Sequence, residues 1–297
     1  MIVIQLKGGL GNQMFQYAAA KALSIKNNCS IKIDLSFLEN TRSFVTETFT
    51  PREFELNIFH KINTEFITTK EKNKFFKESR LNNLKMKLGI TYFKKYDEIS
   101  LKYFDDYFHL KQPIFLNGYF ASEKYFKQVE SIIYQEYQFP SLMNDNANYA
   151  FELSIKNNTS ISVHVRRGDY LKPKVLNFHG ICDIIYYRNA IDMMKKIFPD
   201  SVLYFFSDDI NWVNEHLLSL YPHSFLVNAN SGKQSWKDMY LMSCCNHHII
   251  ANSSFSWWAA WLNKKTDKKV IAPKQWFADT ILNDQTVDFV PKQWIRI

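Results

Sequence analysis

The sequence predicts an α/β protein with two Rossmann-like domains that face a central cleft. Two observations carry this prediction: apolar strands alternate with helices through the second half of the chain, and the first half opens with a strand, a glycine-rich turn and a helix. Strands that alternate with helices build a parallel, doubly wound sheet. A polar break, Phe139-Pro140 followed by 144–148, marks the expected hinge. We place the domains at 1–150 and 151–297.

Hydrophobic periodicity predicts the elements of each half. In the first half we expect strands at 2–6, 30–34 and 113–118 and helices at 12–26 and 122–137. Between them, about 61–111 is predicted to be a charged helical insert, because it shows no strand alternation. In the second half we expect strands at 160–165, 202–207, 224–227, 248–251 and 269–272, and helices at 186–198, 210–220, 235–244 and 256–262.

The composition is typical of a globular protein with a large core. Hydrophobic residues make up 46% and aromatic residues 16% of the 297 residues, and 8 glycines and 8 prolines are too few for a disordered chain. No apolar run approaches the ~18 residues of a membrane helix, and no signal-peptide pattern is present, so we expect a cytoplasmic protein. The cysteines fit neither a disulfide framework nor a zinc site; they are Cys29, Cys182, Cys244 and Cys245.

The formal net charge is +8, and the segment 61–111 holds 12 Lys/Arg against 7 Asp/Glu. A solvated helical surface explains this excess. The alternative is a basic surface that docks peripherally on anionic lipid at the inner face of the plasma membrane. Charge alone also permits nucleic-acid binding, but no nucleic-acid motif supports it.

Residues 161–170, Ile-Ser-Val-His-Val-Arg-Arg-Gly-Asp-Tyr, carry the strongest local signal. A strand that ends at Arg166-Arg167 puts two fixed positive charges at the carboxyl edge of a sheet, where open α/β sheets bind ligands. The planar guanidinium pairs with phosphate oxygens and stays charged. The alternative interpretation is a surface ion pair between Arg167 and Asp169.

A second signal is the glycine-rich turn at the start of the chain. Gly8, Gly9 and Gly11 allow close backbone approach, and the N-terminus of the following helix favours an anion. The turn is neither a Walker loop nor a Gly-x-Gly-x-x-Gly motif. Asn12 and Gln13 carry amides that suit a sugar, a phosphate or a crossing strand.

A third signal lies at 249–262, where an apolar strand meets a helix. Asn252 and Ser253 can cap that helix, and Ser254 and Ser256 can donate to an oxygen held at its N-terminus. These hydroxyls exceed what a helix cap needs. The tryptophans that follow are predicted to lie in the core; they are Trp257, Trp258 and Trp261.

Four blocks in this order carry a family resemblance. They are Gly8-Gly-Leu-Gly-Asn-Gln-Met-Phe-Gln-Tyr17, His164-Val-Arg-Arg-Gly-Asp-Tyr170, Phe206-Ser-Asp-Asp209 and Asn252-Ser-Ser-Phe-Ser-Trp-Trp258. The chain resembles the bacterial α-1,2-fucosyltransferases, of the glycosyltransferase family 11 type, over nearly its whole length. The resemblance is weakest at about 61–111. It implies GT-B architecture, with an acceptor-side N-terminal domain and a GDP-sugar-binding C-terminal domain.

The resemblance also implies a reaction: inverting transfer of L-fucose from GDP-β-L-fucose to the 2-hydroxyl of a terminal β-galactoside. In the wider fucosyltransferase group the residue that matches Arg166 binds the β-phosphate, while Arg167 is secondary and expected to be oriented by Asp169. His164 and Asp238 match guanine contacts. The catalytic candidates are Arg166, Arg167 and Asn12; the donor-binding candidates are Gly9, Gly11, Asn12, His164, Arg166, Asp208, Asp238, Ser253, Ser254, Phe255 and Ser256.

The general base is not identified by the sequence. The α-1,6 relatives carry a glutamate shortly after the arginine block, whereas 170–178 contains no carboxylate. His179 and Asp183 are the nearest titratable candidates, unless the departing phosphate takes the proton. Adjacent carboxylates at a strand end diverge, so Asp208-Asp209 is expected to contact the nucleoside or cap a helix, and we expect no metal or other cofactor.

Other functions stay open at this point. One is a fucosyltransferase of other regiochemistry or another GDP-sugar transferase, which donor screening would separate. A nucleotide-binding regulatory or nucleic-acid-binding protein would show salt-sensitive retention on DNA or RNA without sugar transfer. A carbohydrate-binding module would bind glycans regardless of GDP. The basic nucleotide clamp argues against the last two.

Overall fold

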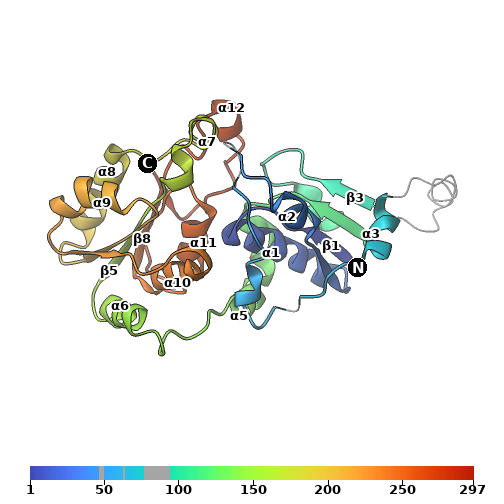
Figure 1. The fold of residues 1–297 in the computed structure, drawn as a ribbon, viewed down its shortest axis with the longest axis horizontal. Helices are drawn as coiled ribbons and strands as arrows, with labels where there is room; N and C mark the ends of the chain where they lie inside the picture. Colours follow the sequence, from blue (N-terminus) through green and yellow to red (C-terminus); the bar gives the residue numbers. More distant parts are fainter. Residues whose placement is uncertain (47–49, 63, 77–93) are drawn as a thin grey trace. The chain divides into compact units, whose positions relative to one another are not determined.

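The computed structural model describes residues 1–46, 50–62, 64–76 and 94–297, and Figure 1 shows them as a ribbon. The chain forms two compact units, and each is described by itself. Unit 1 comprises Met1–Val45, Pro51–Gln138 and Val287–Phe289, and unit 2 comprises Thr46–Thr50, Phe139–Thr286 and Val290–Ile297.

The main division therefore lies between Gln138 and Phe139, at the start of the predicted polar break. Our boundary at residue 150 falls instead inside α6 (Asn146–Lys156), a helix that the sequence analysis misses. The short segment Val287–Phe289 also belongs to unit 1, although the residues on both sides of it belong to unit 2.

Unit 1 is built on a four-stranded parallel sheet in the order β2-β1-β4-β3. The strands are β1 (Ile2–Gln5), β2 (Ile31–Asp34), β3 (Lys94–Asp97) and β4 (Ile114–Asn117). β1 pairs with β2 on one side and β4 on the other. β1 and β4 are the two central strands of this sheet, so their carboxyl ends lie side by side.

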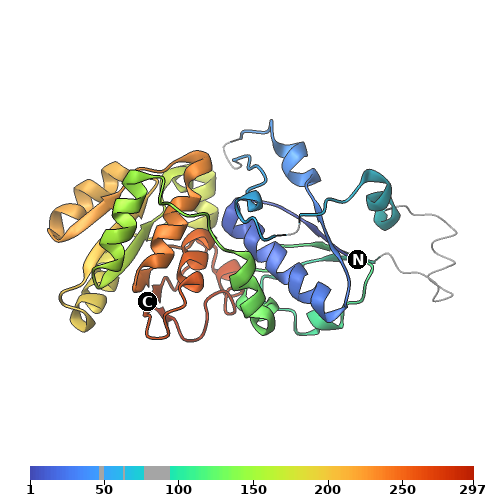
Figure 2. The same cartoon turned by 90° about the horizontal axis from the view of Figure 1, so that it is seen from below.

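The described helices of unit 1 include α1, which packs on β1 and β2 and whose inward positions are alanine, leucine and aromatic residues. They are α1 (Leu10–Lys26), α2 (Ser36–Thr41), α3 (Thr69–Phe76) and α5 (Glu130–Glu136), with 3₁₀ turns at Leu56–Ile58, Asp105–His109, Glu123–Tyr125 and Lys127–Val129. Figure 2 shows α1, in blue, lying along the strands of its unit. Tyr137 donates to Met14 O at 2.6 Å and fixes the chain after α5 against α1.

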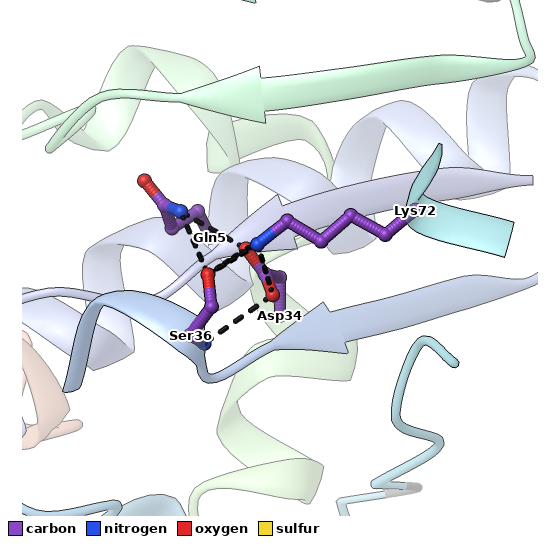
Figure 3. A network of polar contacts seen from close by, with 4 residues as sticks. All are labelled: Gln5, Asp34, Ser36 and Lys72. Atoms are coloured by element: carbon purple, nitrogen blue, oxygen red, sulfur yellow. Dashed lines mark hydrogen bonds and ion pairs between the residues drawn. The ribbon is translucent and has the colours of Figure 1, made fainter. Parts of the chain in front are cut away.

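A buried polar cluster joins the carboxyl ends of β1 and β2 (Figure 3). The Asp34 carboxylate, 3% exposed, accepts from Gln5 Nε2 at 2.9 Å and from Ser36 Oγ at 2.8 Å. Lys72 reaches it from α3, with Nζ 2.9 Å from Asp34 Oδ2, and also contacts Ser36. The ion pair therefore anchors α3, which has one buried side chain, Phe75, to the sheet.

Two predictions for unit 1 are wrong. The segment 61–111 is not a helical insert throughout, because β3 is a strand of the sheet and α3 is a short helix; residues 63 and 77–93 lie outside the described residues. Hydrophobic periodicity does not indicate β3, because it is an edge strand whose residues, Lys-Lys-Tyr-Asp, are exposed or half-exposed. The helix predicted at 122–137 is two 3₁₀ turns followed by α5.

Unit 2 contains a six-stranded parallel sheet in the order β10-β9-β8-β5-β6-β7. The strands are β5 (Ser160–Val165), β6 (Val202–Ser207), β7 (Ser224–Val227), β8 (His247–Ile249), β9 (Val270–Ala272) and β10 (Ile295–Arg296). All five strands predicted here are confirmed, and the short β10 is additional. With two parallel α/β sheets, the predicted fold class is confirmed.

Helices cover both faces of this second sheet (Figure 1). They are α6, α7 (Pro173–His179), α8 (Ile184–Ile197), α9 (Ile210–His216), α10 (Trp236–Cys244), α11 (Ser254–Leu262) and α12 (Thr280–Asn283). One face is apolar: Ile161, Val163 and Val165 of β5 form a core with residues of α8 and α9. On the other face, Tyr204 bonds Ser154 of α6 at 2.7 Å. The described 3₁₀ turns of unit 2 are Gly168–Leu171, Leu218–Leu220 and Gly232–Gln234.

The connections define where this sheet should bind a ligand. β5 pairs with β6, whose connections continue toward β7, and with β8, whose connections continue the other way. The carboxyl ends of β5 and β8 thus form the topological switch point, the usual ligand site of such sheets.

Candidate functional site

Arg166 lies directly after β5, at the switch point of unit 2. Its guanidinium pairs with two carboxylates: Nη2 is 2.5 Å from Asp169 Oδ1, and Nη1 is 2.5 Å from Asp208 Oδ2. The ring of Tyr170 lies 5.2 Å from its Cζ. About a quarter of the side chain is exposed, so Arg166 is held in one orientation and still reachable by a ligand.

Asp208 fixes the turn that carries Arg166. Its Oδ1 accepts from the amides of Arg167 and Gly168 at 2.8 and 3.0 Å, while Oδ2 pairs with Arg166. A Cβ on Gly168 would lie 2.6 Å from Asp208 Oδ2, so glycine is required for this close approach. Asp208 is therefore a structural clamp of the arginine turn.

Arg167 has different partners from those we predict. Its Nε lies 3.1 Å from Asp209 Oδ2, and its guanidinium stacks on Trp212, with Cζ 4.4 Å from the ring centre. Asp209 also caps α9 by accepting from Trp212 N at 3.1 Å. The predicted orientation of Arg167 by Asp169 is therefore corrected: Asp209 orients Arg167, and Asp169 pairs with Arg166.

The two positive charges predicted for this turn are paired with carboxylates. Two arginines face three carboxylates, those of Asp169, Asp208 and Asp209, which leaves a net charge of −1. A diphosphate that binds Arg166 must share the guanidinium with these carboxylates or displace one. Asp208 is fixed by its two further contacts, with the amides of Arg167 and Gly168.

His164 joins β5 to α11, the helix that follows β8. Its Nδ1 lies 2.9 Å from Ser256 Oγ, at the start of α11, and Ser256 Oγ lies 3.4 Å from Ser253 O. Because a carbonyl oxygen only accepts, we assign the hydroxyl hydrogen to Ser253 O and a hydrogen to His164 Nδ1. Burial, and then the nearby Arg166, lower the pKa of His164 to about 3, so the ring is neutral.

The serines and Asn252 have separate roles in this turn. Ser253 caps α11 by accepting from Phe255 N at 3.3 Å, and the Phe255 ring lies 5.8 Å from that of His164. Ser254 begins the helix and is half-exposed. Asn252 is buried and donates to His179 O at 2.9 Å and to Trp276 O at 3.1 Å. Asn252 thus ties neighbouring loops to the switch point.

The two candidate bases are in unequal positions. His179 stacks between the rings of Tyr170 and Phe277, at 4.8 and 5.6 Å, and burial lowers its pKa. The charges of Asp169 and Arg166 both act on it, which places it beside the arginine turn. Asp183 caps α8 by accepting from Tyr186 N at 2.8 Å. That helix-capping contact leaves His179 as the stronger base candidate.

Asp238 lies in the first turn of α10, the helix that follows the carboxyl end of β7. Burial raises its pKa to about 7, against a hydrogen bond from Asn230 Nδ2 at 2.6 Å that lowers it. Asn230 also bonds Asn148 of α6, which bonds Asp145. Asn230 and Asn148 are missed by sequence reasoning, because single asparagines in polar loops give no motif.

In unit 1, the candidates Gly9, Gly11 and Asn12 lie at the start of α1. Gly9 caps the helix, and the carboxylate of Glu55 accepts from the Leu10 amide; burial raises the pKa of this glutamate. The N-terminal amide that we expected to face an anionic ligand therefore already binds a carboxylate. No hydrogen bond is recorded for the side-chain amide of Asn12 within the described residues.

The side-chain amide of Gln13, next to Asn12, is buried and forms hydrogen bonds within the protein. Gln13 donates to Gly8 O at 2.8 Å and Glu53 O at 2.7 Å, and accepts from Glu55 N at 2.9 Å. The amide of Gln13 thus binds its own turn and the loop at 53–55, and neither segment is a strand.

The motifs of both turns belong to one known family. Residues 1–297 match the family model described as glycosyl transferase family 11. The chain belongs to glycosyltransferase family 11. The resemblance carried by the four blocks is thereby confirmed.

Relatives of this family 11 glycosyltransferase cover its full length. The chain is 34% identical to an alpha-1,2-colitosyltransferase of Escherichia coli, across 100% of this chain and 99% of the relative. It is also 34% identical to the O-antigen biosynthesis glycosyltransferase WbnK of Escherichia coli, across 98% and 99%. Mouse galactoside alpha-(1,2)-fucosyltransferase 1 is 29% identical, across 53% of this chain and 44% of the relative.

Among solved structures, the fucosyltransferase NodZ from Bradyrhizobium is similar with a TM-score of 0.48 and 13% identity, across 88% of this chain and 92% of NodZ.

Further features of this family 11 glycosyltransferase concern metals and membranes. Across the part of the chain that the structure describes, no three His, Cys, Asp or Glu side chains are grouped as metal ligands. The Cys244–His248 stretch has protein contacts instead: His248 lies 2.8 Å from both Ser162 Oγ and Asn263 Nδ2. None of the described helices has the length and apolar character to cross a bilayer.

Proposed function

We propose that this chain transfers L-fucose from GDP-β-L-fucose to the 2-hydroxyl of a terminal β-galactoside, with inversion to an α-1,2 linkage. Membership of family 11 supports sugar transfer, and the mammalian galactoside α-1,2-fucosyltransferases support this sugar and linkage. The observation that carries the proposal is Arg166, aimed by Asp169 and Asp208 at the switch point of unit 2.

Arg166 supplies the electrostatic part of the mechanism. As the glycosidic bond breaks, negative charge develops on the β-phosphate, and a prepositioned guanidinium stabilises this charge without reorganising. The phosphate would share the guanidinium with Asp169, whereas Asp208 keeps the turn in place. We propose that this clamp works without a metal ion or other cofactor, which unchanged turnover in excess EDTA would test.

Neutral His164 and Asp238 are proposed to bind the guanine. With a hydrogen on Nδ1, His164 presents Nε2 as an acceptor. The Asp238 carboxylate accepts from the N1–H and N2–H groups when ionised, held in place by Asn230. Ser254 at the start of α11 is proposed to donate to a phosphate oxygen.

His179 is proposed as the general base. Its lowered pKa keeps the imidazole neutral and able to accept a proton from the attacking hydroxyl at pH 7. The imidazole ring is held by stacking on the rings of Tyr170 and Phe277. In the alternative, the phosphate takes the proton, and a His179→Gln variant would keep most of its turnover.

A second donor is favoured by the 34% identical colitosyltransferase. Colitose is L-fucose without its 3-hydroxyl. A site that hydrogen-bonds this hydroxyl rejects the deoxy sugar by a factor of about 10⁴, because its polar groups would stay unpaired. A site without that contact discriminates weakly.

The deciding experiment offers GDP-fucose and GDP-colitose in competition with a panel of lactose, N-acetyllactosamine and Gal-β1,3-GalNAc, with linkages assigned by NMR. We expect α-1,2-fucosyl products and at least about a tenfold preference in kcat/KM for GDP-fucose. A preference for GDP-colitose would assign the second donor. Transfer from a different GDP-sugar, or to a hydroxyl other than O2, would contradict the proposal.

A further inference from the structure

The first sheet has two central strands, β1 and β4, whose carboxyl ends lie side by side. Lys7 stands two residues after β1, and Tyr119 stands two residues after β4. Open parallel sheets bind their ligands outside the carboxyl ends of the strands. The two side chains are thus at the place in unit 1 where a ligand is expected.

The backbone of Lys7 is fixed by hydrogen bonds to a side chain of α1, whereas its ammonium group is not fixed in this way. Gln16, fully buried in α1, accepts from Lys7 N at 2.9 Å and donates to Lys7 O at 3.2 Å. Within the described residues, no hydrogen bond or ion pair is recorded for Lys7 Nζ; it lies 5.3 Å from the centre of the Phe37 ring. Partial burial lowers the pKa of Lys7. A lysine so placed has three unused donors.

Tyr119 is presented by a strained turn. The next residue, Phe120, has a φ of 51°, a conformation that is rare for a bulky side chain, and its ring is fully buried. Such strain persists only where the surroundings enforce it, and it concentrates at functional sites. Tyr119 itself is 40% exposed, and no hydrogen bond is recorded for its hydroxyl within the described residues.

Glu98 enforces this turn. Its carboxylate accepts from Tyr119 N at 2.6 Å and from Phe120 N at 3.1 Å. A Cβ on Gly118 would lie 2.5 Å from Glu98 Cβ, so only glycine allows the approach. Glu98 is also among the charges that act on Lys7, which places the lysine near the same turn. Glu98 is therefore a positioning residue for Tyr119.

The charges around the turn favour a neutral ligand. Lys7 and Lys95 are balanced by Asp97 and Glu98, which act on Lys7 together. Sugar hydroxyls can both donate to carboxylates and accept from an ammonium, so they suit a turn whose charges cancel. An exposed tyrosine ring suits the apolar face of a galactose ring.

We propose that Lys7 and Tyr119 form a carbohydrate-binding subsite in unit 1, which takes a β-galactoside through hydroxyl contacts to Lys7 and stacking on Tyr119. This inference rests on the proposed function for its choice of sugar. It adds two binding residues, Lys7 and Tyr119, and one positioning residue, Glu98.

The test is a lactose titration of the full chain followed by NMR, on wild type, Lys7→Met, Tyr119→Ala and the control Lys26→Met. Lys26 is an exposed lysine in the last turn of α1, the end of the helix remote from Lys7. We expect the Kd of lactose to rise at least about tenfold in the first two variants, as for the loss of one charge-assisted hydrogen bond. It should stay unchanged in Lys26→Met. The Kd of GDP should stay unchanged in all three.

Two results separate this subsite from the proposed function. If wild type transfers fucose and Lys7→Met binds lactose within twofold of wild type, the subsite is overturned and the function stands. If lactose binds and Lys7→Met weakens it while no sugar is transferred from GDP-fucose or GDP-colitose, the function is overturned and the subsite stands. A loss of GDP binding equal to the loss of lactose binding would also overturn the subsite, because it indicates general damage.

Discussion

His164 Nδ1 lies 2.9 Å from Ser256 Oγ, and this contact joins β5 to α11 across the switch point of unit 2. Both side chains are nearly inaccessible, at 6% and 1% exposure. The hydroxyl decides which ring nitrogen of His164 carries hydrogen, and hence which nitrogen is left to accept. Ser256 thereby controls a residue proposed to bind guanine.

Removing this hydroxyl should affect both stability and donor binding. Ser256→Ala leaves a buried ring nitrogen without a partner, so we expect a free energy of unfolding lower by about 1–3 kcal/mol, measured by urea denaturation. The Kd of GDP should rise. The matched control is Ser254→Ala in the same turn, which should keep wild-type stability. Equal stability of Ser256→Ala and wild type would contradict the assigned contact.

Arg166→Ala should retain the fold and lose transfer. Loss of one preorganised donor to developing charge lowers kcat by about 10²–10³. Arg166→Lys should recover little, because an ammonium cannot bridge Asp169 and Asp208 as the guanidinium does. Arg188→Ala, at an exposed arginine of α8, is the control. Turnover of Arg166→Ala within tenfold of wild type would remove Arg166 from the mechanism.

Gly168→Ala should damage activity through Asp208. The new methyl group would lie 2.6 Å from Asp208 Oδ2, and Asp208 cannot retreat without breaking its contacts to the amides of the turn. A displacement of about 1 Å near reacting groups can lower the rate up to about 10²-fold. We expect kcat to fall at least about tenfold with little change in the Kd of lactose. Wild-type kcat would show that the turn tolerates the shift.

Donor binding should depend on pH through Asp238. Burial raises its folded-state pKa to about 7, so the carboxyl is largely protonated at pH 6 and ionised at pH 8. Only the ionised form accepts from both guanine donors, so GDP affinity should fall about tenfold from pH 8 to pH 6. Calorimetry at both values would measure this fall.

Asp238→Asn provides the control for that measurement. The phosphates of GDP titrate in this range too, but they do so equally with wild type and variant. His164 does not contribute, since its pKa is about 3. An identical pH dependence in Asp238→Asn would contradict the role of Asp238.

The raised pKa of Asp238 gives the stability of the fold a pH dependence opposite to that of GDP binding: stability falls as pH rises. The folded protein binds the Asp238 proton more tightly than the unfolded chain, so folding is favoured below the ordinary pKa of aspartate. This contribution is lost as pH rises toward about 7.

The sequence predicts the alternating elements of unit 2 well because each strand is a short apolar run beside a polar turn. Arg166, His164 and the serines can be placed near the carboxyl ends of strands for the same reason, because they stand where an apolar run ends. The partners of the arginines are not predictable in this way. Asp169 is near Arg167 in sequence, yet the turn directs it to Arg166, while Asp209, the N-cap residue of α9, reaches Arg167.

Sequence patterns are less informative in unit 1. β3 carries polar residues because it lies at a sheet edge, so periodicity gives no sign of it. Lys7 and Glu98 belong to no sequence motif. They come near each other only because β1 and β3 pair with β4 on its two sides. The positive φ of Phe120 accompanies the hydrogen bond from its amide to Glu98. A phenylalanine gives no indication of such a backbone conformation.

The cluster in Figure 3 should govern stability and leave donor binding unchanged. Lys72→Met leaves the buried Asp34 carboxylate without its cation, and breaking such a pair costs about 3–5 kcal/mol. Because Lys72 is 25% exposed, we expect the lower end, about 3 kcal/mol, by urea denaturation. Lys74→Met, at an exposed position of the same helix, should be neutral.

A double-mutant cycle makes this prediction specific to the ion pair. Asp34→Asn removes the buried charge and keeps an oxygen that can accept from Gln5 and Ser36. Lys72→Met should therefore cost much less in the Asp34→Asn background than in wild type, with a coupling energy above about 1 kcal/mol. Additive costs would mean that Lys72 stabilises the fold through other contacts, such as those of its Nζ with the rings of Phe76 and Phe115, rather than through its pair with Asp34.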